Sequence, residues 1–243
     1  MSLASLTDGY TAAVFGASGG LGRALVHQLA ANPRCARVYA GARSNPAQDH
    51  AKIVSFCFDL TNLASLEAAA HTIGSPDIVI VATGVLHSEH LAPEKSMRAL
   101  DPDQLNLAFA INAAGPASIA RLLLPAMPRN RRTVFAALSS RVGSISDNRL
   151  GGWHSYRASK AALNMLVRCL AIEQARSHPL AVCVALHPGT ADTGLSKPFQ
   201  SGVSPDRLFS PAQSSSHLLD VLDTLTPSQS GRLFAWDGQE IAP

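Results

Sequence analysis

The sequence predicts an α/β fold in which a doubly wound, mainly parallel sheet of seven strands carries helices on both faces. Seven short segments along the 243 residues are continuously apolar, without the alternation of apolar and polar residues typical of a half-exposed strand. Strands covered on both faces of a parallel sheet have this pattern. Stretches with helical periodicity separate the segments, and such alternation implies crossover connections between parallel strands. No repeat or low-complexity linker interrupts the pattern, so we expect a single domain over residues 1–243.

The expected strands combine β-branched, aromatic and small apolar residues. In chain order they are TAAVFGA at 11–17, RVYAGA at 37–42, KIVSFCF at 52–58, DIVIVAT at 77–83, RTVFAAL at 132–138, AVCVALH at 181–187 and GRLFAW at 231–236. The expected helices, in which apolar residues recur at helical spacing, cover residues 21–31, 62–73, 102–127, 155–176 and 211–225.

Two segments, 85–101 and 188–211, fit neither pattern. They follow the fourth and the sixth expected strands and contain Pro or Gly, so both leave the carboxyl edge of the sheet. Ligands bind at this edge in open α/β sheets, and long loops there are usually functional. We therefore expect both segments to be functional, with residues 85–101, 141–155 and 190–208 walling a substrate pocket; a surface excursion without function is the alternative.

The composition is that of a globular protein, with 47% hydrophobic and 15% charged residues and a net charge of +3. Basic residues are scattered, apart from a group at Arg129, Arg131 and Arg132, so we expect neither a nucleic-acid nor a membrane partner. There is no signal-peptide pattern and no apolar run of about 20 residues, which favours a cytoplasmic protein. The cysteines are dispersed, and each is expected to be a small core residue; they are Cys35, Cys57, Cys169 and Cys183.

A glycine-rich turn, VFGASGGLGRAL at 14–25, joins the first expected strand to the first helix. Gly16 permits a tight turn, Gly20 lets phosphates approach the backbone, and Gly22 lets the helix pack closely. The helix N-terminus adds unpaired N–H groups and a positive dipole end. Glycines in such a turn can be there for steric reasons alone, but directly after the first strand of a doubly wound sheet they indicate a dinucleotide site.

The end of the second expected strand indicates which dinucleotide binds. An NAD site places an acidic residue here for the ribose hydroxyls, whereas this chain has Ala42, Arg43 and Ser44. A guanidinium group suits the 2′-phosphate of NADP. The sequence favours NADP(H) over NAD(H), although an arginine can also simply end a strand in solvent.

Four polar residues form a candidate catalytic set. Tyr156 and Lys160 are four residues apart and share one face of a helix. An ammonium group beside a phenol favours the phenolate and prepares it for proton transfer, although such a pair is often only surface decoration. Ser140 ends the fifth strand, either as a turn former or as a hydrogen-bond donor to a substrate carbonyl. Asn112 interrupts a long helix near Pro116, either as a functional break or as a solvent-facing residue.

The order of these motifs resembles the short-chain dehydrogenase/reductase (SDR) family along nearly the whole chain. The matching elements are Gly16-x-x-x-Gly20-x-Gly22, Asp59, Asn112, Ser140, Tyr156-x-x-x-Lys160 and HPGTADT at 187–193. The segment around SSRVGSISDNRLGGWHSYRASKAALNML is similar to the C-factor-like branch, which includes the Sniffer-type carbonyl reductases. The resemblance implies a single-domain Rossmann fold. Three positions depart from the family pattern: VATGV replaces the usual N-A-G element, the Ser140–Tyr156 interval is longer, and Gly19 replaces a basic residue of many NADP-dependent members.

The resemblance also implies roles. Tyr156 would be the general acid in carbonyl reduction and the general base in alcohol oxidation, Lys160 would lower the pKa of Tyr156 and hold the nicotinamide ribose, and Ser140 would orient the carbonyl. Asn112 would anchor a water-mediated proton relay to Lys160. The implied cofactor-binding residues are Gly16, Ser18, Gly19, Gly20, Leu21, Gly22, Arg43, Ser44, Asp59, Leu60, Ala82, Thr83, Gly84, Tyr156, Lys160, Pro188, Gly189, Thr190 and Thr193.

We therefore predict an NADP(H)-dependent carbonyl reductase or alcohol dehydrogenase that acts on a small-molecule carbonyl or alcohol. Candidate residues lining the substrate pocket are Trp153, His154, Leu195 and Phe199. A dinucleotide-binding signalling or sensor protein with little turnover is the alternative, because the C-factor branch is associated with developmental signalling. A metal site at His87, Glu89 and His90 is disfavoured by its spacing, so no metal is expected. The helices around 103–127 and 155–176 carry excess apolar surface, and in the family their equivalents form a subunit contact, so we expect a homodimer or homotetramer.

Overall fold

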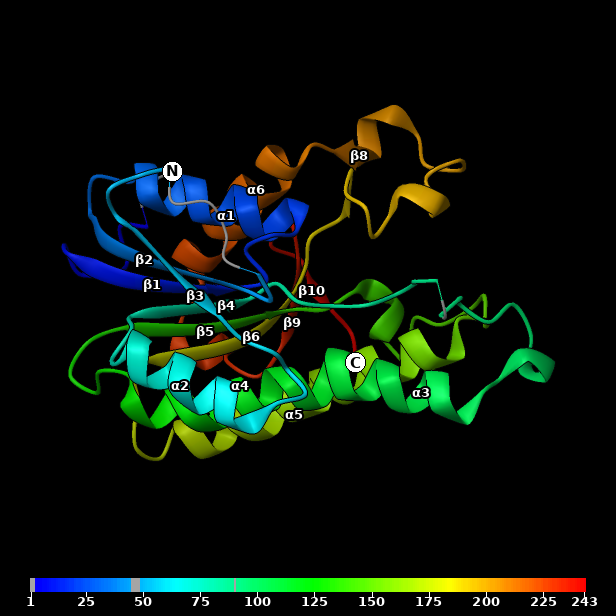
Figure 1. The fold of residues 1–243 in the computed structure, drawn as a ribbon, viewed down its shortest axis with the longest axis horizontal. Coiled ribbons are helices and arrows are strands. Elements are labelled where there is room, and N and C mark those ends of the chain that lie inside the picture. Colours follow the sequence, from blue (N-terminus) through cyan, green and yellow to red (C-terminus); the bar gives the residue numbers. More distant parts are fainter. Residues whose placement is uncertain (1–2, 45–48, 90) are drawn as a thin grey trace.

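The computed structural model describes residues 3–44, 49–89 and 91–243. Its central sheet has the strand order β10-β9-β6-β5-β4-β1-β2-β3 (Figure 1). The strands of this sheet are β1 (Tyr10–Phe15), β2 (Cys35–Ala42), β3 (Ile53–Cys57), β4 (Ile78–Val81), β5 (Thr133–Leu138), β6 (Ala181–His187), β9 (Leu233–Ala235) and β10 (Glu240–Ile241). A separate pair, β7 (Thr190–Ala191) and β8 (Leu208–Phe209), lies within the segment that follows β6.

All seven expected strands are found and pair in parallel, which confirms the α/β fold. The expected number of strands is wrong, because the sheet has eight. The additional strand, β10, covers only two residues and pairs antiparallel with β9 after a turn at Gly238, where φ is +81°. Two residues carry no periodic pattern, so this strand leaves no signal in the sequence.

The helices cover both faces of the sheet, with α1 and α6 on one side and α2, α4 and α5 on the other (Figure 1). Their bounds are α1 (Gly20–Ala31), α2 (Leu63–Ile73), α3 (Pro102–Phe109), α4 (Gly115–Leu123), α5 (His154–Gln174) and α6 (Pro211–Thr224). Single turns of 3₁₀-helix lie at Met97–Ala99, Leu124–Ala126, Arg141–Gly143, Lys197–Phe199, Pro205–Arg207 and Pro227–Gln229.

Each central strand contributes to two hydrophobic cores. Val14 of β1 and Ile80 of β4 pack with residues of α1 and α6. The next residues along these strands, Phe15 and Val81, pack with residues of α2, α4 and α5. Successive side chains of a strand point to opposite faces, so burial of both requires the continuously apolar segments seen in the sequence.

The helix expected over 102–127 is broken at Asn112, as the sequence suggested. A π-helical turn, Ala110–Ala114, separates α3 from α4. Pro116 lacks the N–H that would bond the carbonyl of Asn112 in a regular α-helix, which explains a break at this point. Asn112 is fully buried, so the solvent-facing alternative is wrong. By length and composition alone, Pro102–Ala126 could cross a membrane, with a mean hydropathy of 1.5 over its most apolar 18-residue window. Half of that window is buried inside the protein, as in a helix that packs in a protein core.

The expectation that every cysteine lies in the core is also wrong. Cys35 and Cys183 are buried, whereas Cys57 and Cys169 are exposed. Cys57 ends β3, the edge strand of the sheet, and an edge position depends on the strand order. The sequence around a cysteine does not reveal this order.

Two of the clustered arginines support the fold. Arg131 forms an ion pair with the buried Asp77, with Nε 2.6 Å from the carboxylate. Arg132 donates hydrogen bonds to the carbonyl groups of Leu222 and Leu225 at the C-terminal end of α6. Basic residues at a helix C-terminus satisfy its last carbonyl groups.

Candidate active site

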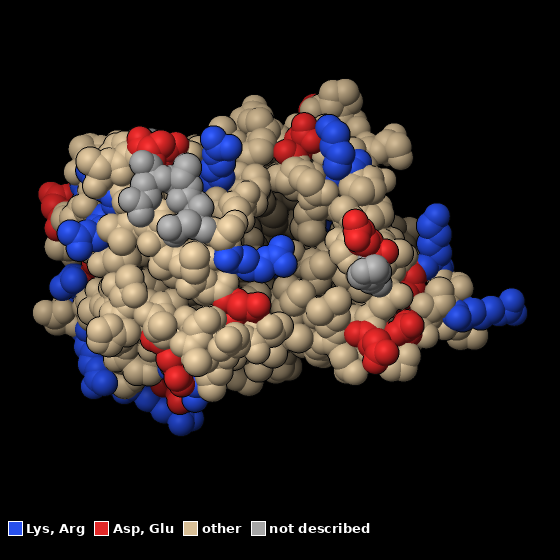
Figure 2. All heavy atoms as spheres, viewed as in Figure 1, with Lys and Arg blue, Asp and Glu red and all other residues tan. Residues whose placement is uncertain are grey.

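A cavity of about 860 Å³ lies at the carboxyl edge of the sheet, and Figure 2 shows the surface hollowed on this side of the molecule. The chain winds outward in opposite directions from β1 and β4, so the switch point of the sheet lies between these two strands. Ligands of doubly wound sheets bind at such a point. The glycine turn after β1 and the residues that follow β4 both line the cavity.

The glycine turn is as tight as predicted. Gly16 adopts a φ of +93°, and a Cβ at this position would lie 2.9 Å from the carbonyl oxygen of Ala82. A Cβ on Gly22 would overlap the carbonyl oxygen of Gly16, so Gly22 packs against the turn itself. Helix α1 begins at Gly20 without a side-chain cap for its first N–H groups, and the residues of this first turn line the cavity. This is the geometry of a phosphate cradle.

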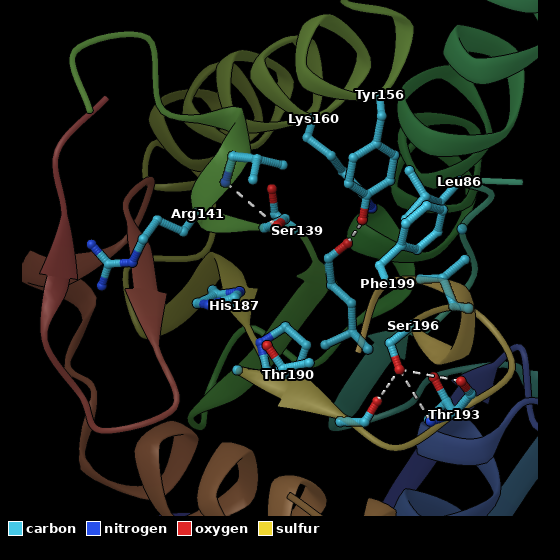
Figure 3. A pocket seen from close by; sticks show the side chains of 18 of the residues that line it. Leu86, Ser139, Arg141, Tyr156, Lys160, His187, Thr190, Thr193, Ser196 and Phe199 are labelled. Atoms are coloured by element: carbon cyan, nitrogen blue, oxygen red, sulfur yellow. Dashed lines mark hydrogen bonds between the residues drawn. The ribbon is translucent and has the colours of Figure 1, made fainter. Parts of the chain in front are cut away.

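Tyr156 and Lys160 extend from α5 toward the cavity, opposite Thr190 and Thr193 (Figure 3). Both side chains are buried, and the Lys160 Nζ lies 5.8 Å from the centroid of the Tyr156 ring. The same Nζ donates a hydrogen bond to the Leu138 carbonyl over 2.7 Å. The predicted shared helix face is therefore confirmed, and surface decoration is excluded.

Ser140 is the second residue after β5, and its hydroxyl is hydrogen-bonded to that of Tyr156. Burial raises the pKa of Tyr156 to about 12, and the bond with Ser140 opposes this rise. Burial also lowers the pKa of Lys160 to about 8. The pKa of Tyr156 is thus shifted by burial and by Ser140 in this structure, and its expected lowering by Lys160 stays a prediction.

Asn112 connects the loop after β4 to α5. Its Oδ1 accepts a hydrogen bond from the Val85 N–H over 2.8 Å, and its Nδ2 donates to the Val85 carbonyl over 2.9 Å and to the Ser159 hydroxyl over 3.0 Å. A Cβ on Gly84 would lie 3.4 Å from Asn112 Oδ1 and 3.6 Å from Lys160 Nζ, so both groups approach the same point. Through these bonds to Val85 and Ser159, Asn112 holds the loop after β4 against α5.

The segments 85–101 and 188–211 meet above Tyr156. The Trp153 ring lies 6.2 Å from that of Tyr156 and 4.9 Å from that of Phe199, between ring centroids. His87 lies 5.7 Å from the Phe199 ring, and its Nε2 is 3.0 Å from the Gly194 carbonyl oxygen. These contacts form an aromatic wall beside Tyr156.

Most predicted site residues meet at this cavity. Those that line it are Gly19, Gly20, Leu21, Gly22, Ala82, Thr83, Gly84, Ser140, Tyr156, Lys160, Pro188, Gly189, Thr190 and Thr193, with the predicted pocket residues Trp153, Leu195 and Phe199. The prediction that His154 lines the pocket is wrong. His154 is the first residue of α5, and its Nδ1 is buried without a hydrogen-bond partner among the described residues.

The other predicted residues do not line the cavity; they are Gly16, Ser18, Arg43, Ser44, Asp59, Leu60 and Asn112. Leu60 packs against Gly115 at the start of α4. Arg43 is exposed after β2. Hydrogen bonds from the Thr61 N–H and hydroxyl lower the pKa of Asp59, and the charge of Arg43 lowers it further. Arg43 is therefore near enough to Asp59 for their charges to interact.

His187 and Glu94 are among the residues at the site that were not predicted. His187 ends β6 and lines the cavity, where burial, together with the charge of Arg141, lowers its pKa to about 4, so the ring is neutral at pH 7. His187 directly precedes Pro188, a predicted cofactor-binding residue, and this position could have indicated that it lies at the site. Glu94 is buried in the segment 85–101 and bonds to the start of α5. No local pattern marks it.

His90 of the disfavoured metal site lies outside the described residues. Among residues 3–44, 49–89 and 91–243 no group of three or more His, Cys, Asp or Glu side chains is arranged to hold a metal ion.

Known proteins support this architecture. The chain matches the family model of the short chain dehydrogenases over residues 10–203. It is 36% identical to the C-signal of Myxococcus xanthus over 58% of this chain and 81% of that protein. It is 33% identical to a 1-hydroxy-2-glutathionyl-2-methyl-3-butene dehydrogenase of Rhodococcus sp. (strain AD45) over 74% of this chain and 76% of that protein.

Two solved structures share the fold over almost their whole length. The carbonyl reductase Sniffer of D. melanogaster superimposes with a TM-score of 0.85 at 21% identity, covering 96% of this chain and 99% of that chain. The NADPH-bound carbonyl reductase from chicken fatty liver superimposes with a TM-score of 0.83 at 25% identity, covering 98% of this chain and 95% of that chain. The chain therefore belongs to the short chain dehydrogenase family, whose members include oxidoreductases.

Proposed function

We propose that this protein is an NADP(H)-dependent oxidoreductase that transfers hydride between the nicotinamide and a carbonyl or alcohol substrate. The observation that carries the proposal is the convergence of Ser140, Tyr156 and Lys160 in one cavity that also reaches the glycine turn. Residues 1–243 would act as one dinucleotide-binding and catalytic domain, with 188–211 as the substrate segment. Nicotinamide, when bound, supplies or accepts the hydride.

The residues present fit a dinucleotide. A Cβ on Gly20 would lie 2.7 Å from the Thr193 methyl group, so a glycine is needed where the turn and the segment after β6 approach each other. The start of α1 would hold the pyrophosphate, and Lys160 would hold the nicotinamide ribose hydroxyls. Pro188, Gly189 and Thr193 would position the carboxamide.

Arg43 supports NADP(H) over NAD(H). It follows β2, where a carboxylate would instead select the unphosphorylated ribose. The chicken carbonyl reductase, at 25% identity, was solved with NADPH, which agrees with this choice.

In the reductive direction, the Tyr156 phenol would donate its proton to the carbonyl oxygen as hydride adds to the carbon. Ser140 would donate a second hydrogen bond to the same oxygen. A pKa of about 12 keeps Tyr156 protonated at neutral pH, so the proton to be donated is in place. In the oxidative direction, the ammonium of Lys160 would stabilise the phenolate, and a relay anchored at Asn112 would carry the released proton.

The substrate would be partly apolar, because Trp153, Leu195 and Phe199 line the cavity. The Rhodococcus relative is named for a dehydrogenase reaction on a glutathionyl alcohol, so larger substituted alcohols belong in the first screen.

The test is a titration of purified protein with NADPH and NADH, following nicotinamide fluorescence, for wild type and Arg43→Ala. We expect tight NADPH binding that weakens at least tenfold in the variant, while NADH binding is unchanged, because a charge-assisted bond to phosphate contributes about 1.5–3 kcal/mol. Equal binding of both cofactors in both proteins would contradict the NADP(H) preference. Absence of binding would contradict the proposed function.

A signalling or sensor function is the second candidate, because the C-signal of Myxococcus xanthus is 36% identical to this chain. Tyr156→Phe separates the two functions. It removes the acid that turnover needs and leaves the cofactor contacts of the glycine turn and of Lys160. Signalling that survives this change would reject a strictly enzymatic account.

We also propose a cytoplasmic homodimer or homotetramer formed through α3 and α5. Large apolar side chains are exposed on both helices: Leu107 and Phe109 on α3, and Met165 and Ile172 on α5. Sedimentation velocity measures the oligomeric state; a stable monomer at all concentrations would contradict this part of the proposal.

A further inference from the structure

The helix that carries Tyr156 and Lys160 begins without a cap of its own. Trp153 occupies the N-cap position in a left-handed conformation, with φ of +51°, and its side chain makes no capping bond. Gly151 and Gly152 before it have φ of +64° and +63°. The first N–H groups of a helix need acceptors from elsewhere, particularly where the helix start is buried.

Glu94 supplies these acceptors from a distant segment. Its carboxylate accepts hydrogen bonds from the Ser155 N–H, at 3.3 and 3.2 Å for the two oxygens, and from the Ser155 hydroxyl. Its backbone carbonyl accepts the Trp153 N–H over 2.5 Å. One residue thus bonds both to the left-handed position and to the first turn of α5.

The site is built for an ionised carboxylate. Glu94 is only 3% exposed, and burial by itself raises the pKa of its carboxyl. The hydrogen bonds from Ser155, with the nearby His154, outweigh burial and bring this pKa below its ordinary value. A negative charge at a helix N-terminus also interacts favourably with the helix dipole. A Cβ on Gly152 would lie 3.3 Å from the Glu94 carbonyl oxygen, so the two segments are in close contact.

The capped residues are adjacent to the reaction centre. Tyr156 follows Ser155 directly, and Tyr156 and Glu94 border the same small cavity of about 10 Å³. Trp153 contacts Tyr156 and Phe199 in the aromatic wall. Any shift in the start of α5 therefore moves both the phenol and the wall of the pocket.

We propose that Glu94 is a positioning residue that caps α5 through Ser155 and Trp153 and thereby holds Tyr156 in hydrogen-bonding register with Ser140. It also ties the position of the segment 85–101 to that of the phenol. The inference rests on the proposed function where it concerns turnover, and on the structure alone where it concerns the geometry of Trp153 and Tyr156.

The activity test compares Glu94→Ala and Glu94→Gln with Glu89→Gln, an exposed carboxylate of the same segment. We expect kcat for carbonyl reduction to fall on the order of 10²-fold in Glu94→Ala. The loss is smaller in Glu94→Gln, which keeps an acceptor oxygen. The Kd for NADPH stays the same, because the glycine turn is untouched. The limb of the kcat profile that reports Tyr156 moves to higher pH, since the bond with Ser140 that lowers this pKa weakens.

A second readout does not depend on activity. The chain has two tryptophans, so Trp236→Phe leaves Trp153 as the fluorescent reporter. In that background Glu94→Gln should shift Trp153 emission to longer wavelength and increase its quenching by acrylamide, and Glu89→Gln should do neither. Glu94→Gln also keeps the test possible if Glu94→Ala fails to fold.

The outcomes separate the two proposals. A wild type that binds no NADPH contradicts the proposed function, and the fluorescence comparison then decides the inference alone. Glu94 variants that melt at lower temperature but keep kcat, its pH profile and Trp153 emission would make Glu94 merely structural and overturn the inference.

Discussion

Lys160 should destabilise the fold at neutral pH, and replacing it by methionine should therefore stabilise the protein. Burial lowers the pKa of Lys160 from 10.5 to about 8. A difference of this size corresponds to about 3 kcal/mol that the folded state loses by holding the charged form. Methionine has a similar length and carries no charge, but it leaves the Leu138 carbonyl without its donor, at a cost of about 1–3 kcal/mol.

We expect Lys160→Met to be up to about 2 kcal/mol more stable than wild type at pH 7. Between pH 8 and 10.5 the folded lysine has released its proton while the unfolded lysine still binds one, so wild-type stability rises with pH in this window. The variant lacks this rise, and its advantage disappears towards pH 10. Tyr156, whose pKa is raised by burial, opposes the rise at higher pH equally in both proteins.

Urea denaturation at pH 7, 8, 9 and 10 measures the difference in unfolding free energy. Lys95→Met, at an exposed lysine of the segment 85–101, is the matched control and should show a difference near zero at every pH. A Lys160→Met protein that is less stable than wild type at pH 7, or whose difference does not change with pH, would refute the desolvation argument.

Three further predictions concern the turn, the helix break and the strand end. Gly22→Ala should lower the unfolding free energy by about 1–3 kcal/mol and weaken NADPH binding, because the added Cβ overlaps a backbone carbonyl that cannot move without the turn. Urea denaturation and the fluorescence titration measure both effects. The matched control is Gly19→Ala, whose Cβ would lie 3.4 Å from its nearest neighbour, and its unfolding free energy should fall far less. Asn112→Ala should lower the unfolding free energy by about 2–3 kcal/mol, since it leaves both polar groups of Val85 unpaired; an unchanged thermal midpoint would show that water replaces the side chain. His187 should make the protein acid-sensitive: its folded pKa of about 4 lies below the unfolded 6.5, so stability falls as pH drops through this window, and a His187→Gln variant with the same acid profile would contradict this.

The parallel sheet and the glycine turn were predictable because their causes are local. A strand buried on both faces must be continuously apolar, and β4 with its sequence IVIV meets this demand within four residues. The positive φ of Gly16 is likewise a property of one position. The break at Asn112 was predictable as a break, since Pro116 lacks a donor, but not its burial.

Features that depend on which elements become neighbours were not predictable. Strand β10 exists because two residues return to pair with β9, and Cys57 is exposed because β3 is the edge of the sheet. His154 is two residues from Tyr156 and does not line the cavity, because side chains two positions apart on a helix point in different directions.

That Tyr156 and Lys160 share a helix face follows from the sequence, since helix geometry sets the spacing of residues four apart. Their proton affinities instead depend on the folded protein. Desolvation depends on everything packed around a group, and here it raises the pKa of Tyr156 where the neighbouring ammonium suggested a decrease. The tertiary structure also brought Glu94 to Ser155 across 61 positions of the chain. A contact of that separation arises from the folding of the whole sheet and helix framework, and no local pattern encodes it.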